Sequence, residues 1–294
     1  MNYPIVKVKT VDQLDLYGFL AEPESGIKNF IIIHIHGTGG NFFCNDFYEE
    51  RINSSLKLNC AFLTTNNRGA GIYEVETGTV THGASCEIFE DCLLDIDAWI
   101  ELVFAKGYQN IILEGHSFGT EKCVYYMSKG KYKDKDKIKA LVLLGFCDTI
   151  GTQKKHSDKT GKDYMAEAKD LISKGKGDYL LSDLFAFAGE LPITAKTYIN
   201  FFENGSKLSS VMPFGNGKLD MFSKINVPIL GVIGDQDQKE YTIMPIKDAI
   251  NLLKTENKLA DASQINDCDH GFTGKEKELS EIIAGFLASR LGLN

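Results

Sequence analysis

The chain has 294 residues, of which 43% are hydrophobic and 24% charged, so we expect one large α/β domain, or a core domain that carries an insertion. Its 40 acidic and 32 basic residues give a net charge of −8, which argues against nucleic-acid and anionic-membrane partners, since neither attracts an acidic surface. No run of apolar residues is long enough for a membrane-spanning helix.

Predicted strands and helices alternate through the first half of the chain. Residues 6–11 and 14–20 alternate apolar and polar side chains, which predicts a β-hairpin. Short apolar runs at residues 30–35, 60–65, 110–114 and 140–145 are typical of strands buried on both faces. Helical patterns lie between these runs, at residues 44–58, at 88–106 and from 119 to 129.

This alternation stops after the sixth predicted strand and resumes about eighty residues later. Residues 148–224 contain three short helical patterns, near 163–174, 178–188 and 193–203, and many aromatic side chains. A strand at 227–234, a helix at 242–254, a weak strand at 262–265 and a helix at 276–291 follow. We therefore expect a mostly parallel eight-stranded sheet with helices on both faces. The core would comprise residues 1–147 and 225–294, with 148–224 as an inserted helical cap.

A candidate nucleophile lies where the fifth predicted strand meets a helix. The segment Gly115-His116-Ser117-Phe118-Gly119 fits the pattern G-x-S-x-G, in which a strained turn lifts the serine Oγ clear of the sheet. The pattern alone is weak, but the apolar strand before it and the helix after it are the context that it requires. We expect Ser117 to be a catalytic nucleophile.

A serine hydroxyl needs a base that accepts its proton, and the base needs an acid that orients it. His156 and His270 are the histidines that follow Ser117. His156 stands in a Lys-rich polar stretch and is expected in an exposed loop, whereas His270 follows the last predicted strand and is our candidate base. The acid is expected after the strand at 227–234, where Asp237 is favoured and Asp235 is the alternative.

The glycine-rich segment His36-Gly37-Thr38-Gly39-Gly40 follows the third predicted strand. It could supply one backbone donor to a developing oxyanion, from Thr38 or alternatively Gly39, and Phe118 could supply the other. The segment lacks the Gly-Lys-Ser/Thr ending of a phosphate-binding loop. His34 and His36 have no further strong metal ligand nearby, so we expect no metal and no other cofactor. His36 is expected to brace this loop, and His34 to lie in the core.

Together these segments resemble the α/β-hydrolase superfamily in order and spacing, over nearly the whole chain. Residues 84–126 resemble those of a poorly characterised group of bacterial hydrolases. The resemblance implies a serine hydrolase that cleaves a carboxylic ester or thioester through an acyl-enzyme. Acyl transfer or C–C bond hydrolysis by the same triad, or a non-catalytic binding protein, are the alternatives. The family's usual Gly-x-x-Asp spacing selects Asp237 as the acid.

The aromatic residues, the cysteines and the first residues of the chain bear on the substrate and on the cellular compartment. Aromatic residues of the cap could line a pocket for a small-molecule acyl substrate, and we name Phe185, Phe187, Phe201 and Phe202. The seven cysteines are odd in number and form no C-x-x-C pattern, and the first residues lack the apolar core of a signal peptide. These features predict a cytoplasmic protein. The oligomeric state does not follow from the sequence.

Overall fold

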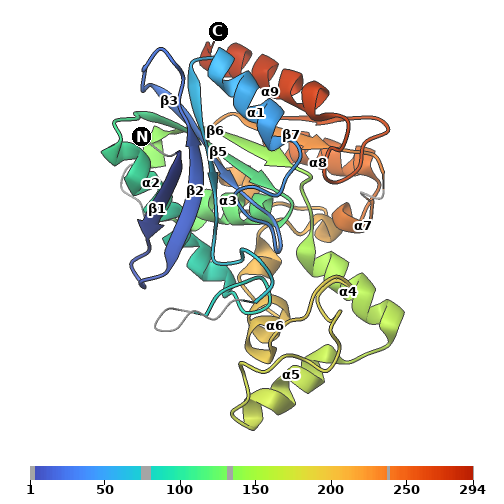
Figure 1. The fold of residues 1–294 in the computed structure, drawn as a ribbon. Helices are drawn as coiled ribbons and strands as arrows, with labels where there is room; N and C mark the ends of the chain where they lie inside the picture. Colours follow the sequence, from blue (N-terminus) through green and yellow to red (C-terminus); the bar gives the residue numbers. More distant parts are fainter. Residues whose placement is uncertain (1–3, 74–80, 131–134, 237–238, 294) are drawn as a thin grey trace.

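A computed structural model of the chain describes residues 4–73, 81–130, 135–236 and 239–293 (Figure 1). Its sheet has the strand order β1-β2-β4-β3-β5-β6-β7-β8. The pairs β1–β2 and β2–β4 are antiparallel and all others are parallel. The eight-stranded, mostly parallel sheet expected from the sequence is therefore confirmed. The strands are β1 (Ile5–Lys9), β2 (Asp15–Ala21), β3 (Phe30–Ile35), β4 (Cys60–Thr65), β5 (Asn110–His116), β6 (Ile138–Leu144), β7 (Ile229–Ile233) and β8 (Ala260–Gln264).

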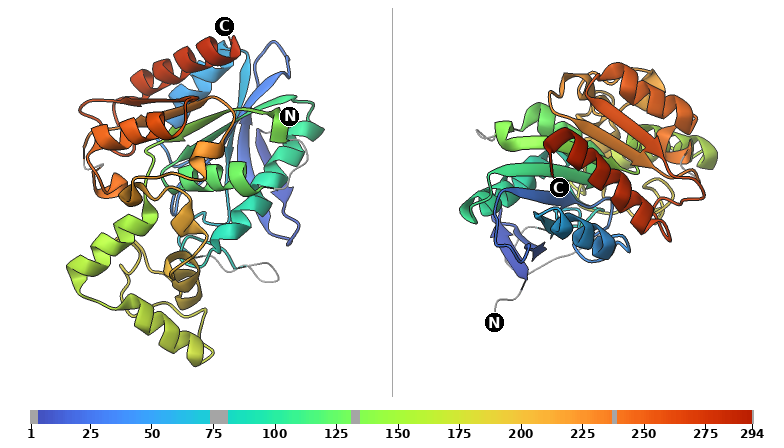
Figure 2. Two further views of the ribbon diagram at one scale, coloured as in Figure 1. Left: turned by 180° about the vertical axis from the view of Figure 1, so that it is seen from behind. Right: turned by 90° about the horizontal axis from the view of Figure 1, so that it is seen from above.

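Helices cover both faces of the sheet (Figures 1 and 2). The α-helices in the described part of the chain are α1 (Tyr48–Lys57), α2 (Cys92–Ala105), α3 (Phe118–Lys129), α4 (Thr149–Thr160), α5 (Tyr164–Ser173), α6 (Ala195–Phe202), α7 (Lys239–Thr242), α8 (Ile246–Glu256) and α9 (Glu276–Leu291). Helices α1 and α9 lie side by side over one face, and α2, α3 and α8 pack on the other. None of the described helices is both long and apolar enough to cross a lipid bilayer.

The central strands are buried on both sides because their side chains alternate between two apolar clusters. In β3, Ile31 and Ile33 belong to the cluster under α2 and α3, while Ile32 belongs to the cluster under α1 and α9. A strand with apolar residues at every position suits this two-faced environment. The carboxyl ends of β3 and β5 are thereby held in register, with Ile35 paired to Gly115.

The segment between β6 and β7 differs from the sequence expectation in two places. Helix α4 occupies residues 149–160, where the Lys-rich polar sequence shows no apolar stripe and no helix was predicted. It is capped by Asp148, whose Oδ1 accepts a hydrogen bond from Gly151 N, and it ends at Gly161 with φ +66°. The predicted helix at 178–188 is wrong. That stretch contains turns and short antiparallel bridges, because Leu180 pairs with Thr194 and Phe187 with Leu191.

Helices α4, α5 and α6 project beyond the sheet as a group of their own (Figure 1). Aromatic side chains attach this group to the core. Phe201 of α6 is fully buried, and its ring lies 5.5 Å from that of Phe118 and 6.4 Å from that of Phe89. The residues after β6 therefore pack directly on the helix that follows Ser117.

Candidate active site

Ser117 occupies a strained turn between β5 and α3. Its φ and ψ are 55° and −128°, a conformation that non-glycine residues rarely adopt. A Cβ on Gly115 would lie 2.4 Å from Gly119 O, and a Cβ on Gly119 would lie 2.2 Å from Ile35 O. Neither flanking position can carry a side chain, so the G-x-S-x-G pattern is required by steric contact. Such backbone strain persists only where the surrounding structure enforces it, and it is typical of functional sites.

His270 lies in the loop between β8 and α9, partly buried, with its Nε2 shielded from solvent. Three contacts position it. His116 donates a hydrogen bond from Nε2 to the backbone oxygen of His270 at 2.8 Å, and Tyr241 stacks on the ring at 4.3 Å. Gly145, with φ +55°, leaves room for the ring, because a Cβ there would lie 2.9 Å from His270 Cε1. Burial lowers the pKa of His270 to about 4, against a smaller raising effect of Asp269. Its imidazole is therefore neutral near pH 7.

Ser117 and His270 line one pocket of about 340 Å³. Thr38, Gly39 and Phe118, the proposed oxyanion donors, line it as well. The glycine-rich loop after β3 passes directly beside the serine, since a Cβ on Gly37 would lie 3.2 Å from Ser117 Oγ. Residues distant in the sequence thus meet around a single cavity.

His36 braces the glycine-rich loop, as the sequence predicts. Its Nδ1 donates a hydrogen bond to Gly37 O at 2.7 Å, and its Nε2 accepts one from Asn67 N at 3.1 Å. Both contacts together require a neutral ring with the proton on Nδ1. Burial and the charge of Lys122 lower the pKa of His36 to about 3, which keeps the ring in that state.

His34 is a core histidine, as expected. Its Nδ1 lies 2.8 Å from Glu114 Oε1, and the other oxygen of Glu114 accepts from Arg51 at 2.7 Å. All three side chains are buried. Within the described residues, no group of three or more His, Cys, Asp or Glu side chains is placed to hold a metal ion.

Of the two candidate acids, Asp235 lies within the described residues and Asp237 does not. Asp235 Oδ1 accepts a hydrogen bond from Cys268 N at 3.0 Å, and Asp235 N donates to Cys268 O at 3.1 Å. The backbone N–H of Cys268 lowers the pKa of Asp235. Asp235 therefore joins the loop after β7 to the loop that carries His270. Asp237 lies outside the described residues, so its role stays a prediction.

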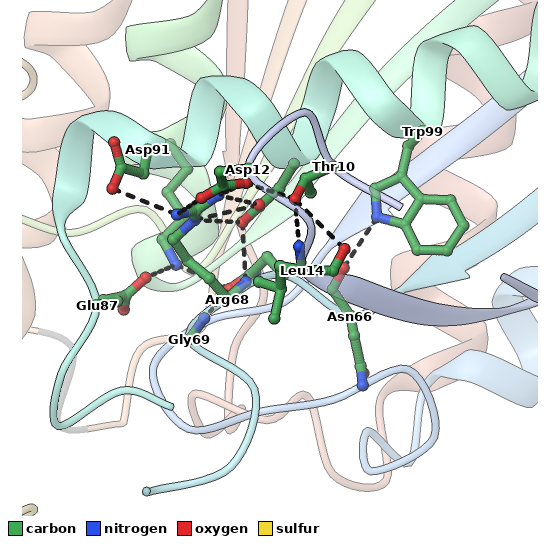
Figure 3. A network of polar contacts seen from close by, with 12 residues as sticks. Thr10, Asp12, Leu14, Asn66, Arg68, Gly69, Glu87, Asp91 and Trp99 are labelled. Atoms are coloured by element: carbon green, nitrogen blue, oxygen red, sulfur yellow. Dashed lines mark hydrogen bonds and ion pairs between the residues drawn. The ribbon is translucent and has the colours of Figure 1, made fainter. Parts of the chain in front are cut away.

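The loop after β4 is fixed from several sides (Figure 3). The Arg68 guanidinium binds Asp95 at 2.8 Å, Asp12 at 3.1 Å and Asp91 at 3.3 Å. Trp99 Nε1 donates to Asn66 O at 2.9 Å. This loop carries Asn67, and it also contacts the glycine-rich loop through the hydrogen bond from Gly71 N to Gly40 O. The network therefore supports the loop beside Ser117.

Two charged residues of α3 are buried, although charged side chains of a helix ordinarily face solvent. Lys122 is fully buried, and its Nζ donates to Glu87 Oε2 at 2.6 Å and to Asn67 Oδ1 at 3.0 Å. Glu121 is buried as well, and it accepts hydrogen bonds from the backbone and the hydroxyl of Thr149. Burial raises the pKa of Glu121 to about 8. Their partners lie 28 to 55 positions away in the sequence, so no local pattern indicates this burial.

Of the four aromatic residues named as substrate contacts, the structure brings Phe187 to the pocket. Phe201 packs in the core between α6 and α3, and Phe185 is 59% exposed. Phe202 lines a separate hollow between α4, α5 and α6. His156, expected in a loop, lies in α4, where its ring stacks on Tyr164.

Comparison with known proteins places this site in a family and a fold. The sequence profile of the family described as "Protein of unknown function (DUF1749)" matches residues 94–283. No curated protein matches the chain. Among solved structures, Est1E from Butyrivibrio proteoclasticus is 17% identical with a TM-score of 0.67, and the alignment covers 98% of this chain and 100% of that one.

Two further solved structures are similar over nearly their whole length. A monoglyceride lipase from Saccharomyces cerevisiae is 14% identical with a TM-score of 0.65, over 99% of this chain and 96% of that one. The esterase Pf2001 of Pyrococcus furiosus is 16% identical with a TM-score of 0.59, over 98% and 90%. At these identities the similarity shows the fold, which is that of the α/β hydrolases.

Proposed function

We propose that the chain, which belongs to the family described as protein of unknown function DUF1749, is a serine hydrolase of carboxylic esters. One observation carries the proposal. Ser117, held at φ 55° on a strand-to-helix turn, shares a pocket with His270 and a glycine-rich loop. The similarity to esterases and to a monoglyceride lipase supports ester hydrolysis.

In the proposed mechanism, Ser117 Oγ attacks the ester carbonyl while His270 accepts its proton. The neutral imidazole described above is the form that a general base requires. The same proton then passes to the departing alcohol, and an acyl-enzyme remains. Water, activated by His270, releases the acid and regenerates the serine. Asp237 is our proposed orienting acid.

Backbone amides would stabilise the negative charge on the carbonyl oxygen in each step. We assign these donors to Phe118 and Thr38, with Gly39 as the alternative to Thr38. Phe118 is the first residue of α3, so its N–H points out of the helix where no backbone carbonyl is available. Removal of one such donor from a serine hydrolase typically lowers kcat by about a hundredfold or more.

We also propose that residues 148–224 act as a cap that forms one wall of the pocket. The wall includes Thr149, Thr152, Phe187, Ala188 and Glu190, all from this segment. A substrate in contact with Ser117 would therefore touch both the cap and the core. The cap residues would then decide which esters fit.

The test is a panel of short-chain p-nitrophenyl esters with wild type and Ser117→Ala, together with a fluorophosphonate probe. We expect turnover and labelling in wild type, and loss of both in the variant with an unchanged thermal unfolding midpoint. Peptide mapping should locate the label on Ser117. Hydrolysis that persists at the wild-type rate in Ser117→Ala would refute the proposed nucleophile.

A further inference from the structure

A tight turn of the proposed cap carries three pocket residues, Phe187, Ala188 and Glu190. Phe187 N donates to Leu191 O at 3.0 Å, and Leu191 N donates back to Phe187 O at 3.3 Å. Between them Ala188 has φ 54° and Gly189 has φ 83°. An alanine in the left-handed region is unusual, and it persists only where neighbouring groups enforce it.

Gln153 of α4 enforces this conformation. Its side chain is 2% exposed, and its Oε1 accepts a hydrogen bond from Ala188 N at 2.7 Å. Its Nε2 donates to Ala186 O at 2.9 Å. The amide therefore binds the turn at Ala188 and the residue just before it, Ala186, and so restrains the backbone that carries Glu190. A group that is held in place by buried contacts is suited to recognition, because little conformational entropy is lost on binding.

Glu190 lines the same pocket as Ser117 and His270. Tyr241 Oη donates to Glu190 Oε1 at 3.4 Å, and the ring of the same tyrosine stacks on His270. Partial burial raises the pKa of Glu190, and the hydrogen bond from Tyr241 lowers it. A carboxylate has about four acceptor positions, and one long hydrogen bond leaves room for a substrate donor.

The remaining described lining of the pocket offers no positive charge. No Lys or Arg occurs among its described lining residues. Burial lowers the pKa of His116 to about 3 and that of His270 to about 4, so both rings are neutral near pH 7. Two threonine hydroxyls of the wall are already used within the protein, since Thr149 donates to Glu121 and Thr152 donates to Asp148 O at 3.0 Å.

We propose that Glu190 is a specificity-determining residue that accepts a hydrogen bond from a hydroxyl or ammonium group of the substrate. The preferred substrates are then esters of polyols or amino alcohols, or of hydroxy or amino acids. Esters with an anionic group near the scissile bond are disfavoured. The inference rests on the proposed ester hydrolysis at Ser117.

The test compares butyrate esters that differ in one group. Dimethylaminoethyl butyrate carries an ammonium near pH 7, isopentyl butyrate is its uncharged isostere, hydroxyethyl butyrate carries a hydroxyl, and carboxyethyl butyrate carries a carboxylate. A second series places the same groups on the acyl side of methyl esters. For each ester, kcat/KM is measured by titration of the released acid.

We expect wild type to prefer the ammonium and hydroxyl esters to the isopentyl ester in one of the two series. Glu190→Gln should lower the ratio of kcat/KM for the ammonium ester over the isopentyl ester by about fivefold, the size of a partly exposed ion pair. Glu190→Lys should raise the ratio for the carboxylate ester over the isopentyl ester. Glu203→Gln is the matched control, because Glu203 is an exposed cap carboxylate that pairs with Lys169 at 3.0 Å and does not line this pocket. It should leave both ratios unchanged.

The outcomes separate this inference from the proposed function. Ratios in Glu190→Gln equal to those of wild type in both series, with hydrolysis intact, would overturn the role of Glu190 alone. An equal change in Glu203→Gln would also overturn it, because the cause would then be net charge. If wild type hydrolyses no ester and the fluorophosphonate probe leaves Ser117 unlabelled, the proposed function fails and the inference fails with it.

Discussion

The buried pair of Lys122 and Glu87 gives the sharpest prediction about stability. Both side chains are fully shielded from solvent, and their charged atoms are 2.6 Å apart. In Lys122→Met the Glu87 carboxylate loses its cationic partner, while a side chain of similar volume fills the space. Removal of one partner from a buried pair costs about 3–5 kcal/mol, because an uncompensated charge remains in a medium of low polarity.

The double variant Lys122→Met/Glu87→Gln separates charge from packing. With both charges removed, most of the loss should be recovered, so that the pair of substitutions costs about 2 kcal/mol or less. Lys129→Met is the control, because Lys129 is an exposed lysine of the same helix and its loss should change stability by under about 0.5 kcal/mol.

Urea unfolding followed by circular dichroism measures these differences, provided that the m-value is the same in all variants. Activity gives a second measurement. Lys122 also donates to Asn67, which holds His36 and through it the loop beside Ser117. We therefore expect kcat of Lys122→Met to fall about tenfold. A loss of stability below about 1 kcal/mol, or a double variant as unstable as the single one, would refute this reasoning.

Three further predictions concern the site and its surroundings. In Gly145→Ala the new Cβ would lie 2.9 Å from His270 Cε1, and residue 145 has a φ of +55°, which is unfavourable for alanine. We therefore expect kcat to fall at least tenfold and the free energy of unfolding to fall by about 1 kcal/mol. A variant with the kcat of wild type would contradict this contact. The pKa of His270 is lowered to about 4, so kcat/KM should be lost only when the pH falls well below about 6.5, the ordinary pKa of histidine. A pH profile in which kcat/KM is half-maximal at or above about pH 6.5 would refute the shift. Glu121 has its pKa raised to about 8, so between its ordinary value and pH 8 the folded chain keeps a proton that the unfolded chain releases. Stability should therefore decrease as the pH rises through this window, by up to about 1.4 kcal/mol per unit. Glu121→Gln should remove that slope, and equal slopes in thermal unfolding of both proteins would show that the group is not neutral when folded.

Local sequence patterns indicated which segments form the strands of the sheet, and where the candidate residues lie relative to those strands. The apolar run of β3 and the glycines around Ser117 are signals of this kind, because each reflects a constraint that acts on adjacent residues. A Cβ at Gly115 or Gly119 would collide with backbone, so the spacing of the motif follows from local geometry. The same holds for the loop after β3, whose glycines allow the chain to pass beside the serine.

Long-range contacts decided what local patterns could not indicate. Helix α4 has a polar sequence, and Thr149 and Gln153 are its fully buried residues, so periodicity did not predict it. Phe187 and Phe201 are both buried aromatic residues of the segment between β6 and β7, and their rings lie 5.8 Å apart, yet Phe187 lines the pocket and Phe201 does not.

The buried charges of α3 and the state of the candidate base also depend on contacts between residues that are distant in the sequence. Nothing in the sequence near Lys122 indicates that it is buried, because its partners Glu87 and Asn67 are distant in the sequence. The pKa of His270 depends on the solvent that the folded chain excludes. The sequence alone indicated the candidate reactive groups, and only the tertiary structure decided their burial and charge, because desolvation is a property of the whole packed chain.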